Sequence, residues 1–208
     1  MSTSSEEHWE QVYRSRPSTE VSWFQAEPAT SLRLIVSAAE GDSSVLDVGA
    51  GSSLLVDALV AGSFTDVTVL DVSEVALDRV RRRLGQSPAV TLVHADLLEW
   101  VAERTYDVWH DRAVFHFLRH PYERARYVEL VEEAISPGGA VVVATFALDA
   151  PTHCSGLEVC RYDVQGLAAE FGSGFDLLHT EREEHVTPGG AIQPFTWAVL
   201  RRRWPRAR

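Results

Sequence analysis

The chain has no lysine, so arginine supplies all 19 of its basic side chains. It also has 30 aspartates and glutamates, which bring the net charge to −11. Because so acidic a protein repels the phosphates of nucleic acids and anionic lipids, we expect neither a nucleic acid nor a membrane as partner. The basic C-terminal stretch RRRWPRAR (201–208) is the exception, and we interpret it as a solvated end.

Cysteine and long apolar runs are also scarce. Cys154 and Cys160 are too few for a disulfide framework, which favours a reducing cytoplasm. No run approaches the roughly 20 apolar residues of a membrane-spanning helix, and the polar N-terminus MSTSSEEHWE does not have the pattern of a secretory signal. His153 stands beside Cys154, but a zinc site needs about four ligands, so we expect no metal.

Apolar segments and amphipathic segments alternate along the chain. Its 208 residues, 45% of them hydrophobic, suit one domain with a sizeable core. The segments predicted as strands are 44–48, 66–72, 89–96, 106–111 and 139–146, and those predicted as helices are 28–39, 73–84, 122–135 and 163–172. This order predicts a doubly wound, Rossmann-like α/β sheet. Segments 175–186 and 195–202 predict a final antiparallel hairpin, which makes a mostly parallel sheet of seven strands.

The stretch VLDVGAGSS (45–53) carries two glycines just after the first predicted strand. Ligands of such sheets bind beyond the carboxyl ends of the strands. Gly49 and Gly51 would let the backbone turn sharply and touch a ligand, and a helix starting near Ser52 would direct its N–H groups at an anion. A dinucleotide fingerprint needs a third glycine where this chain has Leu54, which favours a smaller nucleoside ligand.

Acidic residues stand near the ends of the first three predicted strands. Asp71 can accept hydrogen bonds from both hydroxyls of a ribose, and Asp96 from an adenine amino group, while Leu97 packs on the ring. Taken singly, Asp71 and Asp96 are better explained as caps of helices at Ser73 and 97–103. Together with Asp47 they favour a bound nucleoside.

VLDVGAGSS, VTVLDVS, HADLLEW and ISPGGAVVVATF follow one another in this chain. In that order they resemble the motifs of class I S-adenosylmethionine-dependent methyltransferases, although Ser53 replaces a frequent glycine. The resemblance implies S-adenosylmethionine as cofactor and S-adenosylhomocysteine as product. It also implies a set of cofactor-binding residues, in which Asp47 orients the glycine loop. We expect that set to be Trp23, Asp47, Gly49, Ala50, Gly51, Asp71, Val72, Asp96, Leu97 and His110.

Aromatic residues gather in the segment before the predicted sheet, with Trp9, Tyr13, Trp23 and Phe24 between residues 8 and 25. An aromatic face attracts a sulfonium by cation–π interaction, so Trp23 is a candidate neighbour of the cofactor. The alternative is that these rings simply cover the sheet. We expect residues 1–27 to form a helical, aromatic lid on a methyltransferase domain at 28–208, in a single-domain protein.

The stretch WHDRAVFHFL (109–118) ends the fourth predicted strand, where the acceptor should lie. Methyltransferases of base amino groups often have Asn or Asp, two prolines and an aromatic at this point, so that class is disfavoured. Asp111 or His116 could take a proton from the acceptor, and Arg112 could anchor an anionic one. The alternative reading pairs Asp111 with Arg112 locally and leaves His116 on a helix face.

Three functions remain open from the sequence. The chain resembles thiopurine-type small-molecule methyltransferases, and we expect a small-molecule acceptor that is methylated by in-line displacement. It also resembles methyltransferase-like lysine methyltransferases, so a protein substrate is the alternative. A nicotinamide-dependent enzyme or a noncatalytic nucleoside-binding protein fits less well, because the third glycine is missing and the sheet ends in a hairpin.

Overall fold

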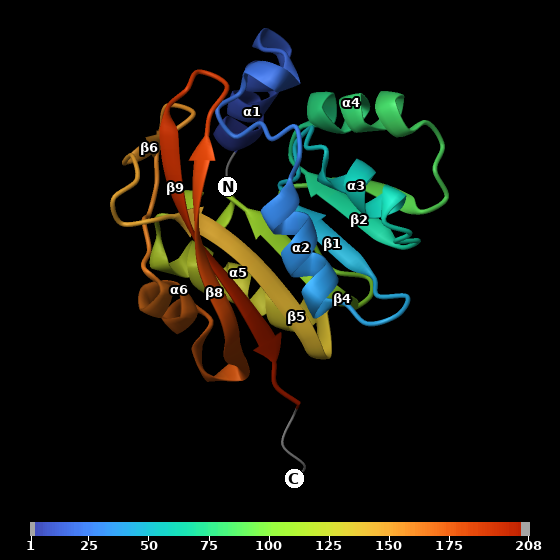
Figure 1. The fold of residues 1–208 in the computed structure, drawn as a ribbon, viewed down its shortest axis with the longest axis vertical. Coiled ribbons are helices and arrows are strands. Elements are labelled where there is room, and N and C mark those ends of the chain that lie inside the picture. The colour runs from blue at the N-terminus through green and yellow to red at the C-terminus, as the bar shows by residue number, and fades with distance from the viewer. Residues whose placement is uncertain (1–2, 205–208) are drawn as a thin grey trace.

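The computed structural model describes residues 3–204. The first two residues of the predicted lid and the last four of the predicted basic tail lie outside this range. A seven-stranded sheet with the order β3-β2-β1-β4-β5-β9-β8 forms the centre of the molecule (Figure 1). Its strands are β1 (Val45–Val48), β2 (Val67–Asp71), β3 (Val90–His94), β4 (Tyr106–Arg112), β5 (Ile135–Phe146), β8 (Phe175–Val186) and β9 (Ile192–Arg202).

Strands β1 to β5 run parallel, and β9 and β8 close the sheet as an antiparallel hairpin. Each face of the sheet has its own apolar core. One face is covered by α2 (Ala29–Ala38), α3 (Leu55–Ala61) and α4 (Glu74–Leu84), and the other by α5 (Pro121–Ala134) and α6 (Val164–Glu170). Every residue of β1 and β2 is buried, as expected for parallel strands covered on both sides. The predicted fold is confirmed.

Three local predictions differ from the structure. Helix α3 begins at Leu55, later than Ser52, because residues 50–54 form a turn in which Ser53 N–H donates to the carbonyl of Ala50. The helix expected at 97–103 is replaced by a turn after Asp96, whose side chain accepts from Leu98 N–H. Strand β5 starts at Ile135, before the expected residue 139. The register between β4 and β5 shifts between Tyr106 and Val108, and this irregularity lets residues 135–138 join the sheet.

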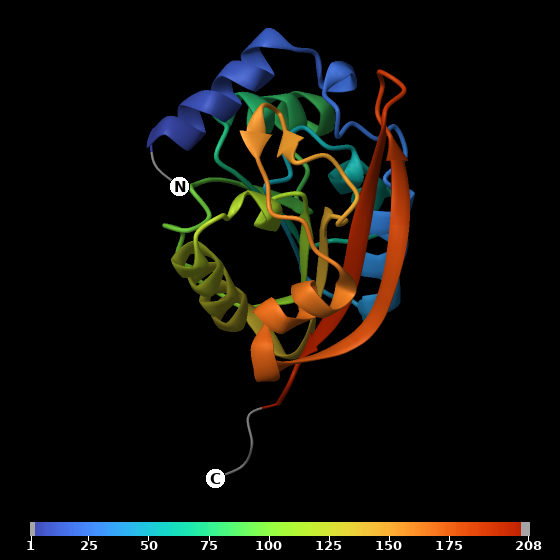
Figure 2. The same cartoon turned by 90° about the vertical axis from the view of Figure 1, so that its left-hand side faces the viewer.

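Helix α1 (Thr3–Ser15) lies across the carboxyl ends of the strands and is fastened to α4 (Figure 2). Glu10 Oε1 accepts hydrogen bonds of 3.1 Å from both Ser73 Oγ and Val75 N–H at the start of α4. From the middle of α4, Arg79 donates to the carbonyl oxygens of Tyr13 and Arg16. These contacts hold the N-terminal helix over the edge where a ligand of this fold binds.

A short hairpin made of β6 (His153–Cys154) and β7 (Leu157–Glu158) covers the same edge from the other side. Its tip reaches α1, where Ser155 Oγ lies 3.5 Å from Nε2 of His8. Figure 2 shows this hairpin in orange below the blue helix α1. The carboxyl edge of the sheet is therefore roofed by two segments that are far apart in the sequence.

Candidate functional site

The loop after β1 makes its tight turns at Gly49 and Gly51, whose φ angles are +56° and +58°. Side chains rarely tolerate such angles, and neither position has space for one. A Cβ atom on Gly49 would lie 2.1 Å from Cγ2 of Val114, and one on Gly51 would lie 2.0 Å from the hydroxyl of Tyr13. The glycines are therefore required by neighbouring protein atoms as well as by the bend.

Asp71 at the end of β2 holds this loop in place. Its carboxylate accepts hydrogen bonds from Gly51 N–H at 2.7 Å and from Ser73 N–H at 2.8 Å. Burial raises the pKa of Asp71 from its ordinary 3.8 to about 6, against the lowering effect of these two bonds. The cap of α4 is Ser73 itself, whose Oγ accepts from Ala76 N–H. Asp71 thus links loop and helix while it also lines a cavity.

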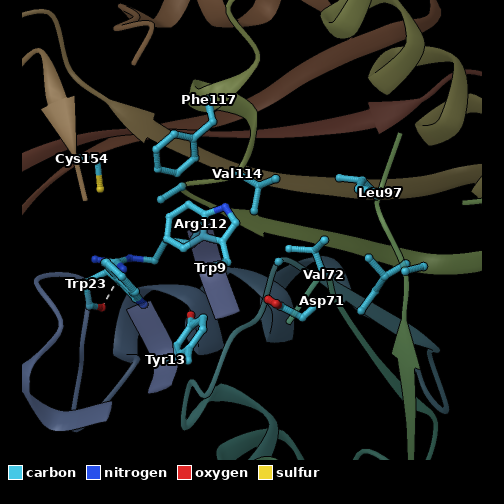
Figure 3. A pocket seen from close by; sticks show the side chains of 14 residues that line it. Trp9, Tyr13, Trp23, Asp71, Val72, Leu97, Arg112, Val114, Phe117 and Cys154 are labelled. Atoms are coloured by element: carbon cyan, nitrogen blue, oxygen red, sulfur yellow. Dashed lines mark hydrogen bonds between the residues drawn. The ribbon is translucent and has the colours of Figure 1, made fainter. Parts of the chain in front are cut away.

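This first cavity lies between the strand ends and the two roof segments, and Figure 3 shows the side chains around it. On one side it is bounded by residues at the carboxyl ends of β2 and β3 and just after them, namely Leu70, Asp71, Val72, Ala95 and Leu97. On the other side stand Trp9, Trp23 and Phe117, with the Trp9 ring 5.7 Å from that of Trp23 and 5.2 Å from that of Phe117. The arrangement suits a nucleoside at one end and an apolar group at the other.

A second cavity adjoins the first, and Trp23, Gly49 and Arg112 line both. Its walls are more polar and include Asp47 from β1 and His110 from β4. Nδ1 of His110 lies 2.7 Å from Oδ1 of Asp47, and both side chains are buried. Nε2 of His110 has no hydrogen-bond partner among the described residues.

Arg112 stands where the two cavities meet, and its side chain is only 9% exposed. It donates one hydrogen bond of 3.1 Å to the carbonyl of Trp23 and lies over the ring of Phe195. Its Nε and Nη2 have no hydrogen-bond partner among residues 3–204. Burial lowers the pKa of Arg112 to about 10, although the nearby carboxylate of Glu183 acts in the opposite direction.

Glu183 on β8 is the acidic neighbour of Arg112, with 3.9 Å between its Oε2 and the Arg112 Nε. The same carboxylate accepts hydrogen bonds from Gln25 Nε2 at 2.8 Å and from Trp197 Nε1 at 2.9 Å. It therefore has fixed partners on the N-terminal segment and on β9. Glu183 neutralises part of the buried charge of Arg112 without occupying its free nitrogens.

Asp111 and His116 are buried and line neither cavity. Asp111 accepts hydrogen bonds from the N–H groups of Val114 and Phe115 and from the hydroxyl of Tyr127, so it fixes the turn that follows β4. Burial, reinforced by the charge of Arg112, lowers the pKa of His116 to about 3. This placement does not support a proton-accepting role for either residue, and Asp111 does not pair with Arg112 as the alternative reading had it.

The structure brings most of the predicted cofactor-binding residues to the two cavities. Gly51 and Asp96 are not in the lining, because Tyr13 covers Gly51, and Ala95 and Leu97 line the cavity on either side of Asp96. The residues in the lining are Trp23, Asp47, Gly49, Ala50, Asp71, Val72, Leu97 and His110. Sequence reasoning did not assign Phe117 or Cys154 to the site. Trp9 and Tyr13 could have been assigned to the site together from the sequence, because residues four apart lie on the same face of a helix.

A doubly wound sheet with a reversed last strand, a glycine loop after β1 and a carboxylate at the end of β2 define the architecture of class I methyltransferases. Residues 45–139 match the family model of a methyltransferase domain. The chain thus carries a methyltransferase domain, and the predicted fold, methyltransferase activity and cofactor S-adenosylmethionine are confirmed. The polar and apolar walls of the two adjoining cavities fit the two ends of that cofactor.

Solved structures with the same fold include a protein from work on the conversion of a disulfide bond into a thioacetal group during echinomycin biosynthesis. It is 17% identical, with a TM-score of 0.77 over 98% of this chain and 94% of that one. The N-methyltransferase NodS of Bradyrhizobium japonicum, solved with S-adenosylhomocysteine, is 15% identical with a TM-score of 0.72 over 94% and 98%.

A third structure is the 1,6-didemethyltoxoflavin-N1-methyltransferase of Burkholderia thailandensis, solved with its named substrate and S-adenosylhomocysteine. It is 17% identical, with a TM-score of 0.72 over 97% of this chain and 85% of that one. At such identities the likeness shows a shared fold. No curated protein sequence matches the chain, and no helix within residues 3–204 has the length and apolar character needed to cross a membrane.

Proposed function

We propose that the protein transfers a methyl group from S-adenosylmethionine to a small-molecule acceptor by in-line displacement. The adenosyl part would occupy the first cavity, with Asp71 at the ribose and Leu97 at the adenine. Trp23, which lines both cavities, would lie beside the sulfonium. The cofactor supplies an electrophilic methyl group, and the residues of this chain bind and align the partners, which is where much of the catalysis of such a transfer can arise.

The main support for a small, polar acceptor is the environment of Arg112. A buried guanidinium with two unused nitrogens is costly unless it meets an oxygen anion or a similar acceptor atom. We therefore assign Arg112 the role of anchoring an acceptor that bears such a group. Trp9 and Phe117 would pack on its apolar part. Asp111 and His116, which are buried and line neither cavity, would support the turn that carries Phe117.

The two roof segments support a small acceptor over a protein. Helix α1 and the β6–β7 hairpin meet through His8 and Ser155, so the edge of the sheet is covered from both sides. A lysine side chain on a protein would need a groove open to the chain that carries it, and no observation favours one. The free Cys154 and Cys160 support a cytoplasmic location, and the net charge of −11 supports the absence of nucleic acid and membrane partners.

Methyl-labelled S-adenosylmethionine, incubated with the protein and a cell extract, tests this proposal. We expect label in the small-molecule fraction, and label confined to the protein fraction would overturn it. Arg112→Gln should lower labelling strongly while the affinity for S-adenosylhomocysteine changes little. A thermal-shift assay should show stabilisation by S-adenosylhomocysteine and none by NAD, because a ligand stabilises the fold it binds.

A further inference from the structure

The free nitrogens of Arg112 belong to a side chain that lies where the two cavities meet. Arg112 and Trp23 line both cavities, and Nη1 of Arg112 donates to the carbonyl oxygen of Trp23. Nε and Nη2 have no hydrogen-bond partner among residues 3–204. In Figure 3, Arg112 and Trp23 lie on one side of the cavity, whereas Asp71 and Leu97 lie on the other. The two nitrogens are therefore available to a ligand at this junction.

The proposed place of the sulfonium is the same junction. With the adenosyl part in the first cavity and Trp23 beside the sulfonium, a group held by Arg112 would lie next to the methyl that is transferred. The guanidinium and the sulfonium are both positive, and like charges repel strongly in a buried site. Glu183 balances part of the guanidinium charge, but it lines neither cavity. An anion between the two positive charges would stabilise both.

Among the described residues, the first cavity offers no side chain that could take a proton from the acceptor. Its titratable side chains besides Arg112 are Tyr13, Asp71 and Cys154. Burial raises the pKa of the Cys154 thiol to about 12 and that of the Tyr13 hydroxyl well above its ordinary value, so both stay protonated. Asp71 already accepts from two backbone N–H groups and faces the proposed ribose. An acceptor without a proton to lose needs no such base.

We propose that the group held by Arg112 is itself the one that is methylated, and that the acceptor is a small organic acid that enters as its anion, a carboxylate or a thiolate. This assignment rests on the proposed function. The anion forms the new bond to the methyl carbon with one lone pair, and the electron pair of the broken carbon–sulfur bond stays on sulfur. One negative and one positive charge cancel, and no proton moves. The other lone pairs of the anion accept from Arg112, which aligns the attacking atom.

The charge of the sulfonium makes this placement testable by calorimetry. S-adenosylmethionine carries that charge, and S-adenosylhomocysteine, which is nearly the same shape, does not. Benzenesulfonate is an anionic probe that is too weak a nucleophile to be methylated, and benzenesulfonamide is its neutral match. Each probe is titrated into protein saturated with either cofactor. Arg112→Gln removes the guanidinium, and Arg104→Gln is the control, because Arg104 pairs with Asp66 at the amino end of β2.

We expect benzenesulfonate to bind at least about fivefold more tightly beside S-adenosylmethionine than beside S-adenosylhomocysteine, which is the lower end of usual couplings between two bound ligands. Benzenesulfonamide should show no such preference. Arg112→Gln should weaken benzenesulfonate about 10- to 100-fold, as for the loss of a hydrogen bond to a charged group, and Arg104→Gln should behave as the wild type. Binding of S-adenosylhomocysteine by Arg112→Gln shows that this variant is folded.

Label transfer at pH 7 identifies the attacking atom. Benzoate and thiophenolate are anions at this pH, whereas phenol and aniline are uncharged. We expect label on at least one of the two anions and on neither uncharged compound. Label on benzoate would identify an ester-forming enzyme, and label on thiophenolate a thioether-forming one.

Three results would overturn the assignment. Equal affinity of benzenesulfonate beside both cofactors would place the anion away from the sulfonium, at a remote end of the acceptor. An unchanged affinity in Arg112→Gln would mean that the guanidinium does not hold the anion. Methyl transfer to aniline and to neither anion would make the acceptor a neutral amine. A wild-type protein that binds neither cofactor would instead refute the proposed function itself.

Discussion

The hydroxyl of Tyr13 lies directly against Gly51, so close that no Cβ atom fits between them. A helix from the start of the chain is thereby packed on the loop that follows β1. The Tyr13 side chain is buried, and its ring stands 6.1 Å from that of Trp23. The conformation of the glycine loop therefore depends on α1 as well as on Asp71. Substitutions in the loop should disturb the packing of α1, and substitutions in α1 should disturb the loop.

Gly51→Ala should lower stability and abolish most binding of S-adenosylhomocysteine, because the new Cβ would lie 2.0 Å from the Tyr13 hydroxyl. Adding Tyr13→Phe should recover part of both losses, since the nearest remaining atom of that ring is then 3.0 Å away. Gly41→Ala is the control: its φ is +55° and nothing lies within 4 Å, so it should show the backbone cost alone, about 1–2 kcal/mol. Equal effects at both glycines in urea unfolding would contradict the predicted clash.

The affinity for S-adenosylhomocysteine should fall as the pH drops below about 6. Asp71, with a pKa of about 6, must be ionised to accept from ribose hydroxyls while it holds Gly51 and Ser73. The charge of nearby Asp47 also raises this pKa, and His94 lowers it. We expect a loss of up to about tenfold per pH unit in calorimetric titrations. Asp71→Asn should bind S-adenosylhomocysteine weakly, with little change in affinity between pH 7 and pH 5. A wild-type affinity that stays constant over this range would contradict the role of Asp71 at the ribose.

The stability of the ligand-free fold should change in the opposite direction over the same range. A carboxyl whose pKa is raised in the folded state binds its proton more tightly there than in the unfolded chain. Asp71 and Asp111, both raised from 3.8 to about 6, therefore stabilise the fold fully below pH 3.8 and lose that contribution as the pH rises through 6. In Asp111→Asn the gain in denaturation midpoint between pH 7 and pH 5 should be smaller than in the wild type.

Arg79→Gln should speed the release of S-adenosylhomocysteine. Arg79 donates to the carbonyl oxygens of Tyr13 and Arg16 and so fastens the end of α1 to α4. Without these bonds α1 should open more often, and the tryptophan fluorescence of the cavity offers a stopped-flow signal. Arg81→Gln is the matched control on the same helix, because Arg81 pairs with the exposed Glu74 and Asp78. Equal release rates in the two variants would show that α1 does not limit exit.

Tyr127→Phe should destabilise the protein by about 1–3 kcal/mol and leave the affinity for S-adenosylhomocysteine unchanged. The hydroxyl accepts from Trp109 Nε1 at 2.8 Å and donates to Asp111 at 2.7 Å, so its removal takes away the acceptor of the buried Trp109 N–H and one of the three donors to Asp111. Tyr122→Phe on the same helix is the control, since Tyr122 is 71% exposed. A large loss of affinity in Tyr127→Phe would instead show that cofactor binding depends on the exact position of the turn after β4, whose Val114 and Phe117 line the first cavity.

The cofactor end of the site was predictable because its residues follow directly from local patterns. Continuous apolar runs predict β1 and β2, and the residues that end such strands in a parallel sheet must meet at one edge. Asp71 and Gly49 could therefore be placed without knowing any distant contact. Asp111 could not, because its direction depends on the turn after β4 and on a hydroxyl from α5.

Glu183 shows why the acceptor end was harder to predict. Strict alternation along β8 would put it on the same face as Phe175, away from Arg112. The register of β8 against β9 shifts between Leu177 and His179, and this bulge reverses the faces of all later residues. Phe175 therefore packs in the core beneath α5 and α6, while Glu183 turns to Arg112 on the other face. Nothing in the stretch HTEREEHV marks where that shift occurs.

The contact between His8 and Ser155 spans 147 positions of the chain. During synthesis α1 leaves the ribosome long before the hairpin that meets it, and before β4 and β5 exist to fill the space beneath. The side chain of Trp9 on that helix stays exposed to water, or bound to a chaperone, until most of the chain has been synthesised. A growing chain can therefore bind the nucleoside only late in its synthesis.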